Sequence, residues 1–209
     1  MPGIHDLGLF VIAGLLLNIT PGADTLYIVG RSTAQGARAG AMAALGVGAG
    51  CCVHTLAAAL GLSAILATSA TAFTLVKIAG AAYLVYLGVS LLRSRGAVEG
   101  HAPMPATPPT RVFLQGMLTN ALNPKVALFF LSFLPQFIDP DAPHKVLSFL
   151  LLGVIFNVNG TLWNLFLAWS SARVGASTRQ SGRFARWRNR AVGSLLIVLG
   201  AKLAFTPQQ

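Results

Sequence analysis

Charged residues are scarce in this chain. Asp, Glu, Lys and Arg make up 10% of its 209 residues, whereas 55% are hydrophobic; a soluble domain carries roughly 25% charged residues. Between Leu7 and Gly30 the only charge is Asp24, and the stretch 39–76 has none. About 20 apolar residues suffice to cross the hydrocarbon core of a bilayer. The composition therefore excludes an ordinary soluble domain and indicates an all-α integral membrane protein in contact with lipid.

Motifs of enzymes and metal proteins are also missing. The two cysteines, Cys51 and Cys52, are adjacent, and helical neighbours point about 100° apart, so a disulfide between them is poorly placed. No metal-ligand cluster, glycine-rich phosphate loop or Gly-x-Ser-x-Gly motif is present. We therefore expect no cofactor, no metal and no enzymatic activity, with an ion or substrate gradient as the energy source. The enzyme alternative is an intramembrane enzyme using His54, for which a hydrogen-bonded core role is favoured.

Basic residues give the chain a net charge of +10, and their placement predicts its orientation. Most of them fall in three segments, which contain Arg31 and Arg38, then Arg93, Arg95 and Arg111, then the run 173–190. These segments follow the first, third and fifth apolar blocks. Because basic residues concentrate in cytoplasmic loops, we expect these loops in the cytoplasm and both termini outside. This placement also argues against a nucleic-acid partner.

Six membrane spans are predicted, at about 5–30, 39–67, 71–92, 112–135, 146–170 and 189–206. Four prolines and two glycines occur in the middle segment, which indicates a cytoplasmic linker at 94–111. The chain thus divides into two three-helix repeats, 1–93 and 112–209.

The two halves share a proline-broken helix. Pro21 and Pro124 are 103 residues apart, and in each case Asn or Thr residues precede the proline within an apolar span. Because three helices per half is an odd number, the second half must be inverted relative to the first. Inverted repeats with interrupted helices are typical of secondary transporters, whose substrate site lies between the repeats.

Polar residues around the breaks are the candidate site. A carboxylate at mid-membrane is costly, so Asp24 is expected to bind a substrate ammonium or carry a proton; the alternative is a dipole partner or N-cap of the half-helix after Gly22. Lys125 is expected to pair with Asp24 or attract a substrate carboxylate, unless it snorkels to the interface. The predicted substrate- and ion-binding residues are Asn18, Thr20, Pro21, Gly22, Asp24, Asn120, Asn123, Pro124, Lys125 and Asn157.

Two further patterns leave alternatives open. Asn157 and Asn164 share one helical face and either line a pathway or bond between helices. Gly46 and Gly50 form a small-xxx-small pair, which lets helices approach closely. Packing within the chain is the favoured reading of this pair, with a homodimer as the alternative.

Several motifs occur along the chain: Thr20-Pro21-Gly22-Ala23-Asp24, the segment Lys77–Gly88, Phe113–Gly116, Leu122-Asn123-Pro124-Lys125, Phe133–Phe137, and glycines Gly193 and Gly200. Through these motifs the chain resembles the lysine-exporter (LysE/RhtB) family of bacterial amino-acid efflux proteins over nearly its whole length, and the resemblance implies a bacterial inner membrane. Many members carry a second proline where this chain has Ala23, so a milder first break is expected here.

The resemblance implies six helices and export of amino acids or derivatives of the threonine, homoserine, lysine or leucine type, driven by proton antiport. It also implies a central constellation of Pro21, Gly22, Asp24, Asn123, Pro124 and Lys125. The alternative function is a membrane channel or ion-flux protein that uses the same broken helices.

Overall fold

A computed structural model describes residues 3–62 and 106–174, together with scattered helical positions between 71 and 93 and between 190 and 201. The described ranges contain six α-helices, a π-helical turn η1 (Ala58–Leu62) and a 3-10 turn η2 (Leu134–Phe137). The α-helices are α1 (Leu7–Ile19), α2 (Ala23–Gln35), α3 (Ala37–Ala57), α6 (Pro109–Ala121), α7 (Pro124–Phe133) and α8 (Lys145–Val174). The predicted third and sixth spans, most of the linker and the basic run after Val174 lie outside the described residues.

Four of the predicted spans have counterparts among these helices. The stretches Ala37–Gly61 and Lys145–Arg173 are each long and apolar enough to cross a membrane. The pairs α1–α2 and α6–α7 also qualify if each is taken as one span, bent by 54° and 48° respectively. Large apolar side chains such as Leu118, Leu162 and Phe166 are more than half exposed, as suits a surface that faces lipid. The arrangement of the two halves as inverted repeats stays a prediction.

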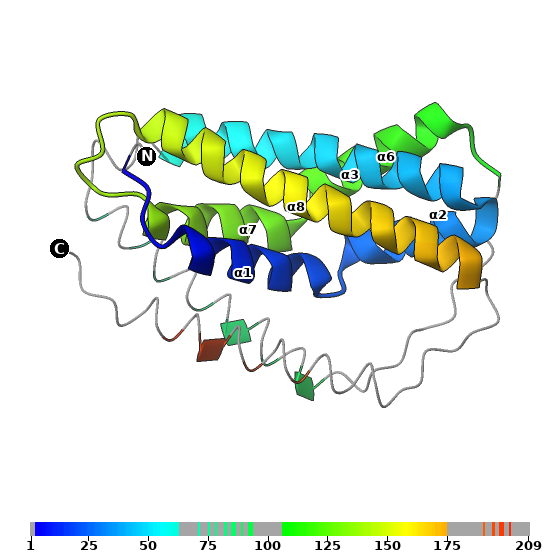
Figure 1. Cartoon of the computed structure of the whole chain (residues 1–209), viewed down its shortest axis with the longest axis horizontal. Coiled ribbons are helices and arrows are strands. Elements are labelled where there is room, and N and C mark those ends of the chain that lie inside the picture. Colours follow the sequence, from blue (N-terminus) through cyan, green and yellow to red (C-terminus); the bar gives the residue numbers. More distant parts are fainter. Residues whose placement is uncertain are drawn as a thin grey trace.

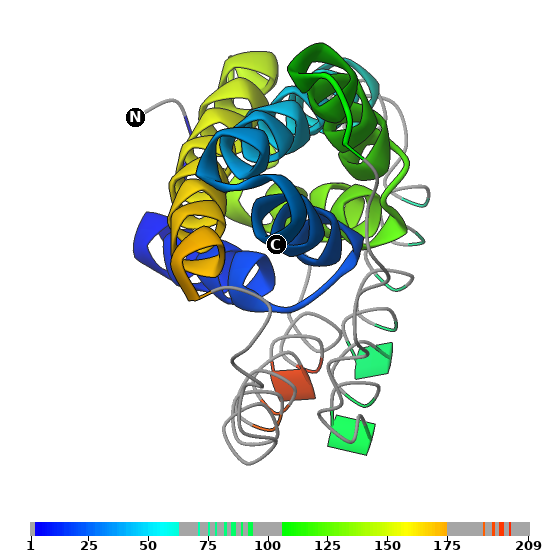
Figure 2. The same cartoon turned by 90° about the vertical axis from the view of Figure 1, so that its right-hand side faces the viewer.

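The bent helices divide the molecule into two ends. Figure 1 shows α1 and α7 at one end of the bundle and α2 and α6 at the other, while α3 and α8 run along its length. The view along the bundle in Figure 2 shows α3 between α8 and α6, and its most extensive contacts are with these two helices. Each break therefore lies near the middle of the bundle.

Glycines allow α3 and α6 to touch. A Cβ at Gly46 would meet the backbone oxygen of Phe113, and one at Gly50 would meet that of Met117. From the other side, a Cβ at Gly116 would lie 2.6 Å from the backbone oxygen of Ala43. The small-xxx-small pair thus packs within the chain, as favoured from the sequence, and the homodimer stays a prediction.

The two ends have different cores. At the α1–α7 end the buried cluster is rich in phenylalanine, with Phe10, Phe129, Phe130, Phe133, Phe137, Phe149 and Phe156 among its members. At the α2–α6 end the cluster is built of smaller residues, Ile28, Ala43, Ala44, Val47, Val112 and Ala168. The first end is therefore filled by aromatic rings that stack or meet edge to face, and the second by smaller aliphatic side chains.

One sequence prediction about the first connection is wrong. Arg31 was placed in the loop after the first span, but α2 continues to Gln35 and Arg31 is only 6% exposed. Three side chains, on Gln35, Thr107 and Gln115, accept hydrogen bonds from its guanidinium. The turn that follows is the single residue Gly36, whose φ of 83° favours glycine.

Candidate functional site

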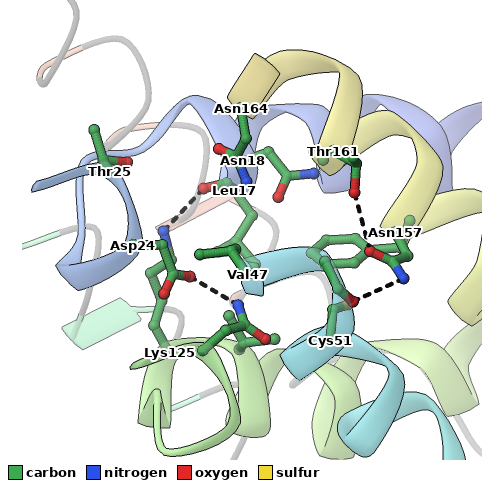
Figure 3. Close-up of a pocket in the computed structure, with 15 residues that line it drawn as sticks. Leu17, Asn18, Asp24, Thr25, Val47, Cys51, Lys125, Asn157, Thr161 and Asn164 are labelled. Carbon is green, nitrogen blue, oxygen red and sulfur yellow. Dashed lines mark hydrogen bonds between the residues drawn. The ribbon is translucent and has the colours of Figure 1, made fainter. Parts of the chain in front are cut away.

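The first break separates α1 from α2 at residues 20–22. In an unbroken helix, the carbonyl of Leu17 would accept a bond from the N–H of residue 21, and Pro21 has no N–H. The Lys125 Nζ fills this place from α7 and donates to the Leu17 oxygen at 3.1 Å (Figure 3). It also donates to the Thr20 oxygen at 2.9 Å. Gly22 keeps the approach open, since a Cβ there would lie 3.3 Å from the same Nζ.

The second break, between α6 and α7, is satisfied in a parallel way. Pro124 leaves the carbonyl of Asn120 without its helical donor. The Asn120 oxygen accepts instead from the Asn123 N–H at 2.8 Å and from His54 Nε2 at 2.9 Å. A carbonyl can only accept, so Nε2 carries the proton. The buried His54 is thus a hydrogen-bonded core histidine, the reading that the sequence favoured.

Asn123 begins α7 as its N-cap. Its side-chain oxygen accepts a bond from the Lys125 N–H at 3.0 Å, a common way to satisfy the first turn of a helix. Pro124 occupies the first helical position, where its missing N–H costs nothing. The N-cap of α2, in contrast, is Gly22, which has no side chain to cap the helix.

Asp24 joins the two breaks. Its Oδ2 accepts hydrogen bonds from Asn120 Nδ2 at 2.8 Å and Asn123 Nδ2 at 3.0 Å, so a carboxylate of the first break is held by amides of the second. The buried Oδ1 has no partner. Asp24 lies in the first turn of α2, where a helix dipole favours an anion, but its side chain turns away to α6 and does not cap the helix.

Asp24 and Lys125 do not form a direct ion pair in the described part of the chain, so of the two roles expected for Lys125 the pairing is not the one seen here. Among the described residues, the ion pairs involve only His5 with Asp6 and Asp139. The ammonium of Lys125 is directed to the backbone of the first break, because the carbonyls of Leu17 and Thr20 need a donor there.

A cavity of about 30 Å³ lies between the breaks (Figure 3). It is lined by Leu17, Asn18, Asp24, Thr25, Val47, Gly48, Cys51, Asn120, Lys125, Val126, Phe156, Asn157, Gly160, Thr161 and Asn164. Ligand pockets usually measure about 300–1,000 Å³, so a small molecule is admitted only after the helices move apart. The wall combines a carboxylate, an ammonium and several amides with apolar side chains.

Half of the residues predicted from the sequence lie in this wall. Five predicted residues line the cavity: Asn18, Asp24, Asn120, Lys125 and Asn157. The other five, Thr20, Pro21, Gly22, Asn123 and Pro124, form the breaks beside it. Asn164 also lies in the wall, in line with the pathway alternative offered for Asn157 and Asn164. Thr161 lies there without having been predicted, although its spacing of four residues from Asn157 is the signal that places it on the same face.

The amides of this wall differ in their bonding. Asn157 Nδ2 donates to the Gly48 oxygen at 3.1 Å, and its Oδ1 accepts from Thr161 Oγ1 at 3.3 Å. The buried Nδ2 of Asn18 has no partner. Asn164 is 8% exposed, and its amide makes no hydrogen bond within the described part of the chain.

A second polar cluster closes the bundle at the α2–α6 end. Arg31 donates to Thr107 Oγ1 and to Gln115 Oε1, each at 2.9 Å. The hydroxyl of Tyr27 donates to the Val112 oxygen at 2.8 Å and lies 3.2 Å from Gln115 Oε1. These bonds, together with one from Gln35 Nε2 to the Thr107 oxygen, tie the first half of the chain to the second above the cavity.

Comparison with known proteins gives the family. The model of the LysE type translocator matches residues 15–206. The chain is 35% identical to an uncharacterized membrane protein of Pseudomonas aeruginosa, over 97% of this chain and 96% of that protein. It is 29% identical to a leucine efflux protein of Salmonella typhimurium, with the same coverage, and 31% identical to an uncharacterized membrane protein of Bacillus subtilis, over 95% of this chain and 98% of that protein. No solved structure matches it.

The family match covers both breaks and the cavity residues between them, and the sequence motifs that indicated this family lie inside the matched range. The chain is a multi-pass membrane protein of the LysE type translocator family, and therefore a transporter and not an enzyme.

Proposed function

We propose that this protein exports amino acids or close derivatives from the cytoplasm as a secondary transporter, in exchange for protons. One observation carries the proposal: Asp24 lies where the two broken helices meet, with one carboxylate oxygen bonded and the other buried without a partner. Burial of an unsatisfied acceptor costs about 1–3 kcal/mol, and more for a charged group. A substrate ammonium or a proton at Oδ1 removes this cost.

Competition between the substrate ammonium and a proton for Asp24 would couple the transport of the two. A protonated carboxyl group no longer attracts an ammonium, whereas a carboxylate does. Substrate from the cytoplasm and protons from outside would therefore occupy Asp24 in turn, and each cycle would exchange one for the other. The leucine efflux protein among the relatives supports an amino acid as the exported compound, with the leucine type as the first candidate of the four classes.

Access to the cavity requires one end of the bundle to open at a time. Arg38 at the start of α3 and Arg111 at the start of α6 are expected to face the cytoplasm, so substrate would arrive through the α2–α6 end. That path is closed by the bonds of Arg31, Tyr27 and Gln115. Hydrogen bonds of this kind can be exchanged for bonds to water as α2 and α6 separate. We also propose that the two halves are inverted relative to each other and that both termini lie on the outer side of the membrane.

Export from cells tests this function. Bacteria that express the protein are fed dipeptides, and the release of each amino acid is measured for the wild type, Asp24→Asn and Asp139→Asn. Asp139 is half-exposed in the segment after η2, which makes it a matched control. We expect the control to behave as the wild type and Asp24→Asn to lose most of the export. Undiminished export by Asp24→Asn across the panel would refute the role of Asp24, and flux that does not saturate with substrate would favour the channel alternative.

A further inference from the structure

The two unbonded amides of the cavity have no structural role that the described residues account for. Asn18 comes from α1 and Asn164 from α8, and Figure 3 shows their side chains next to each other above Asp24. The Asn18 Nδ2 is buried without a partner, which costs about 1–3 kcal/mol, and Asn164 is only 8% exposed. Apolar residues of similar size would avoid this cost, so the pair indicates a ligand.

The packing around these amides makes room for them. A Cβ at Gly160 would come within 3.0–3.2 Å of the atoms of the Asn18 amide, so the glycine on α8 leaves the space that this side chain fills. Asn157 gives an internal comparison on the same helix. Its amide is bonded on both sides, to Gly48 and Thr161, and thus holds α8 against α3. Asn18 and Asn164 make no such link.

The charges around the cavity decide which part of a ligand these amides suit. Asp24 offers a free carboxylate oxygen, which suits an ammonium. Lys125 is the cationic partner for an anion, but two of the three N–H donors of its ammonium are held by Leu17 and Thr20. The remaining donors on the opposite wall are amide N–H groups, which bind carboxylates without a second buried charge.

We propose that Asn18 and Asn164 bind the carboxylate of the transported amino acid, while Asp24 holds its ammonium. This inference rests on the proposed function and adds its carboxylate subsite. Two neutral donors on one side and one carboxylate on the other match an α-amino acid in its zwitterionic form. The cavity opens to admit the substrate, and the amides remain on the α1–α8 side of it.

Binding of matched ligands to purified protein tests the subsite. Isothermal titration calorimetry measures the dissociation constants of L-leucine and L-leucinamide, and of L-threonine and L-threoninamide, for the wild type, Asn18→Leu, Asn164→Leu and Asn159→Leu. Leucinamide and threoninamide keep the ammonium and side chain but lack the carboxylate. Asn159 lies on α8 outside the cavity lining and is the control. Hydrogen bonds to a charged group contribute about 1.5–3 kcal/mol, so loss of one weakens amino-acid binding about tenfold or more.

The expected result is a tenfold or larger rise in the amino-acid dissociation constant for Asn18→Leu and Asn164→Leu, with no change for the amides and none for Asn159→Leu. Equal weakening of amino acid and amide, or no weakening, would overturn the carboxylate subsite while leaving the proposed function standing. If the wild type binds and transports neither amino acid, nor any other of the export panel, the proposed function fails and the subsite fails with it.

Discussion

Lys125 is expected to stabilise the first break, and Lys125→Met tests this directly. The substitution keeps a long side chain and removes the ammonium that donates to Leu17 and Thr20. Both oxygens lose this donor: the Leu17 oxygen keeps only the longer bond from the Thr20 N–H at 3.2 Å, and the Thr20 oxygen belongs to a residue only 1% exposed. One buried acceptor without a donor costs about 1–3 kcal/mol. We therefore expect the free energy of unfolding to fall by about 2 kcal/mol.

A double-mutant cycle with Pro21→Ala isolates this effect. Alanine restores the N–H at position 21 and allows the helical bond to Leu17. The cost of Lys125→Met should then drop by about 1 kcal/mol or more, within the range measured for interacting residues. Denaturant unfolding of the purified protein in detergent gives the four free energies, with Lys145→Met at the start of α8 as the control. An equal cost of Lys125→Met in both backgrounds would refute the idea that Lys125 compensates for Pro21.

Two further predictions concern the α2–α6 end and the α3–α6 contact. Gln115→Ala removes an acceptor from Arg31, so in a Cys52→Ala background an impermeant thiol reagent on the cytoplasmic face should modify the cavity residue Cys51 several-fold faster. An unchanged rate, or the same rise in Gln136→Ala at the other end, would contradict the proposal that these bonds close the cytoplasmic end. Gly116→Ala forces a Cβ to 2.6 Å from the Ala43 oxygen and should lower the free energy of unfolding by about 1–3 kcal/mol. The control Gly8→Ala, whose Cβ meets open space, should not lower it. Equal effects of the two substitutions in denaturant unfolding would show that the α3–α6 contact is not tight.

The backbone consequences of proline were the most predictable part of the site. A proline inside a helical run lacks an N–H and clashes with the preceding turn. This is why α1 ends just before Pro21 and α6 just before Pro124. Asp24 stood out because a carboxylate in an apolar run needs a reason to be there. These local rules placed both breaks and the main anionic residue correctly.

Partners across the bundle were not predictable, because they depend on how the halves pack. Charge alone suggested that Lys125 would meet Asp24, but the carbonyls freed by Pro21 lie within its reach and need a donor. The charge of Arg31 also suggested a loop position, but Arg31 lies inside α2, where its guanidinium donates a hydrogen bond to Gln115 of α6. Helical spacing placed Asn157 and Asn164 on one face, yet only the three-dimensional arrangement distinguishes the bonded amide from the unbonded one.

Proton-driven exchange in proteoliposomes tests the central claim, that Asp24 at the crossing of the broken helices couples substrate to protons. Purified wild type and Asp24→Asn are reconstituted, and export of labelled leucine is measured with and without an inwardly directed proton gradient. The account predicts that the gradient accelerates export by the wild type and has no effect on Asp24→Asn. Equal acceleration of both proteins would contradict it.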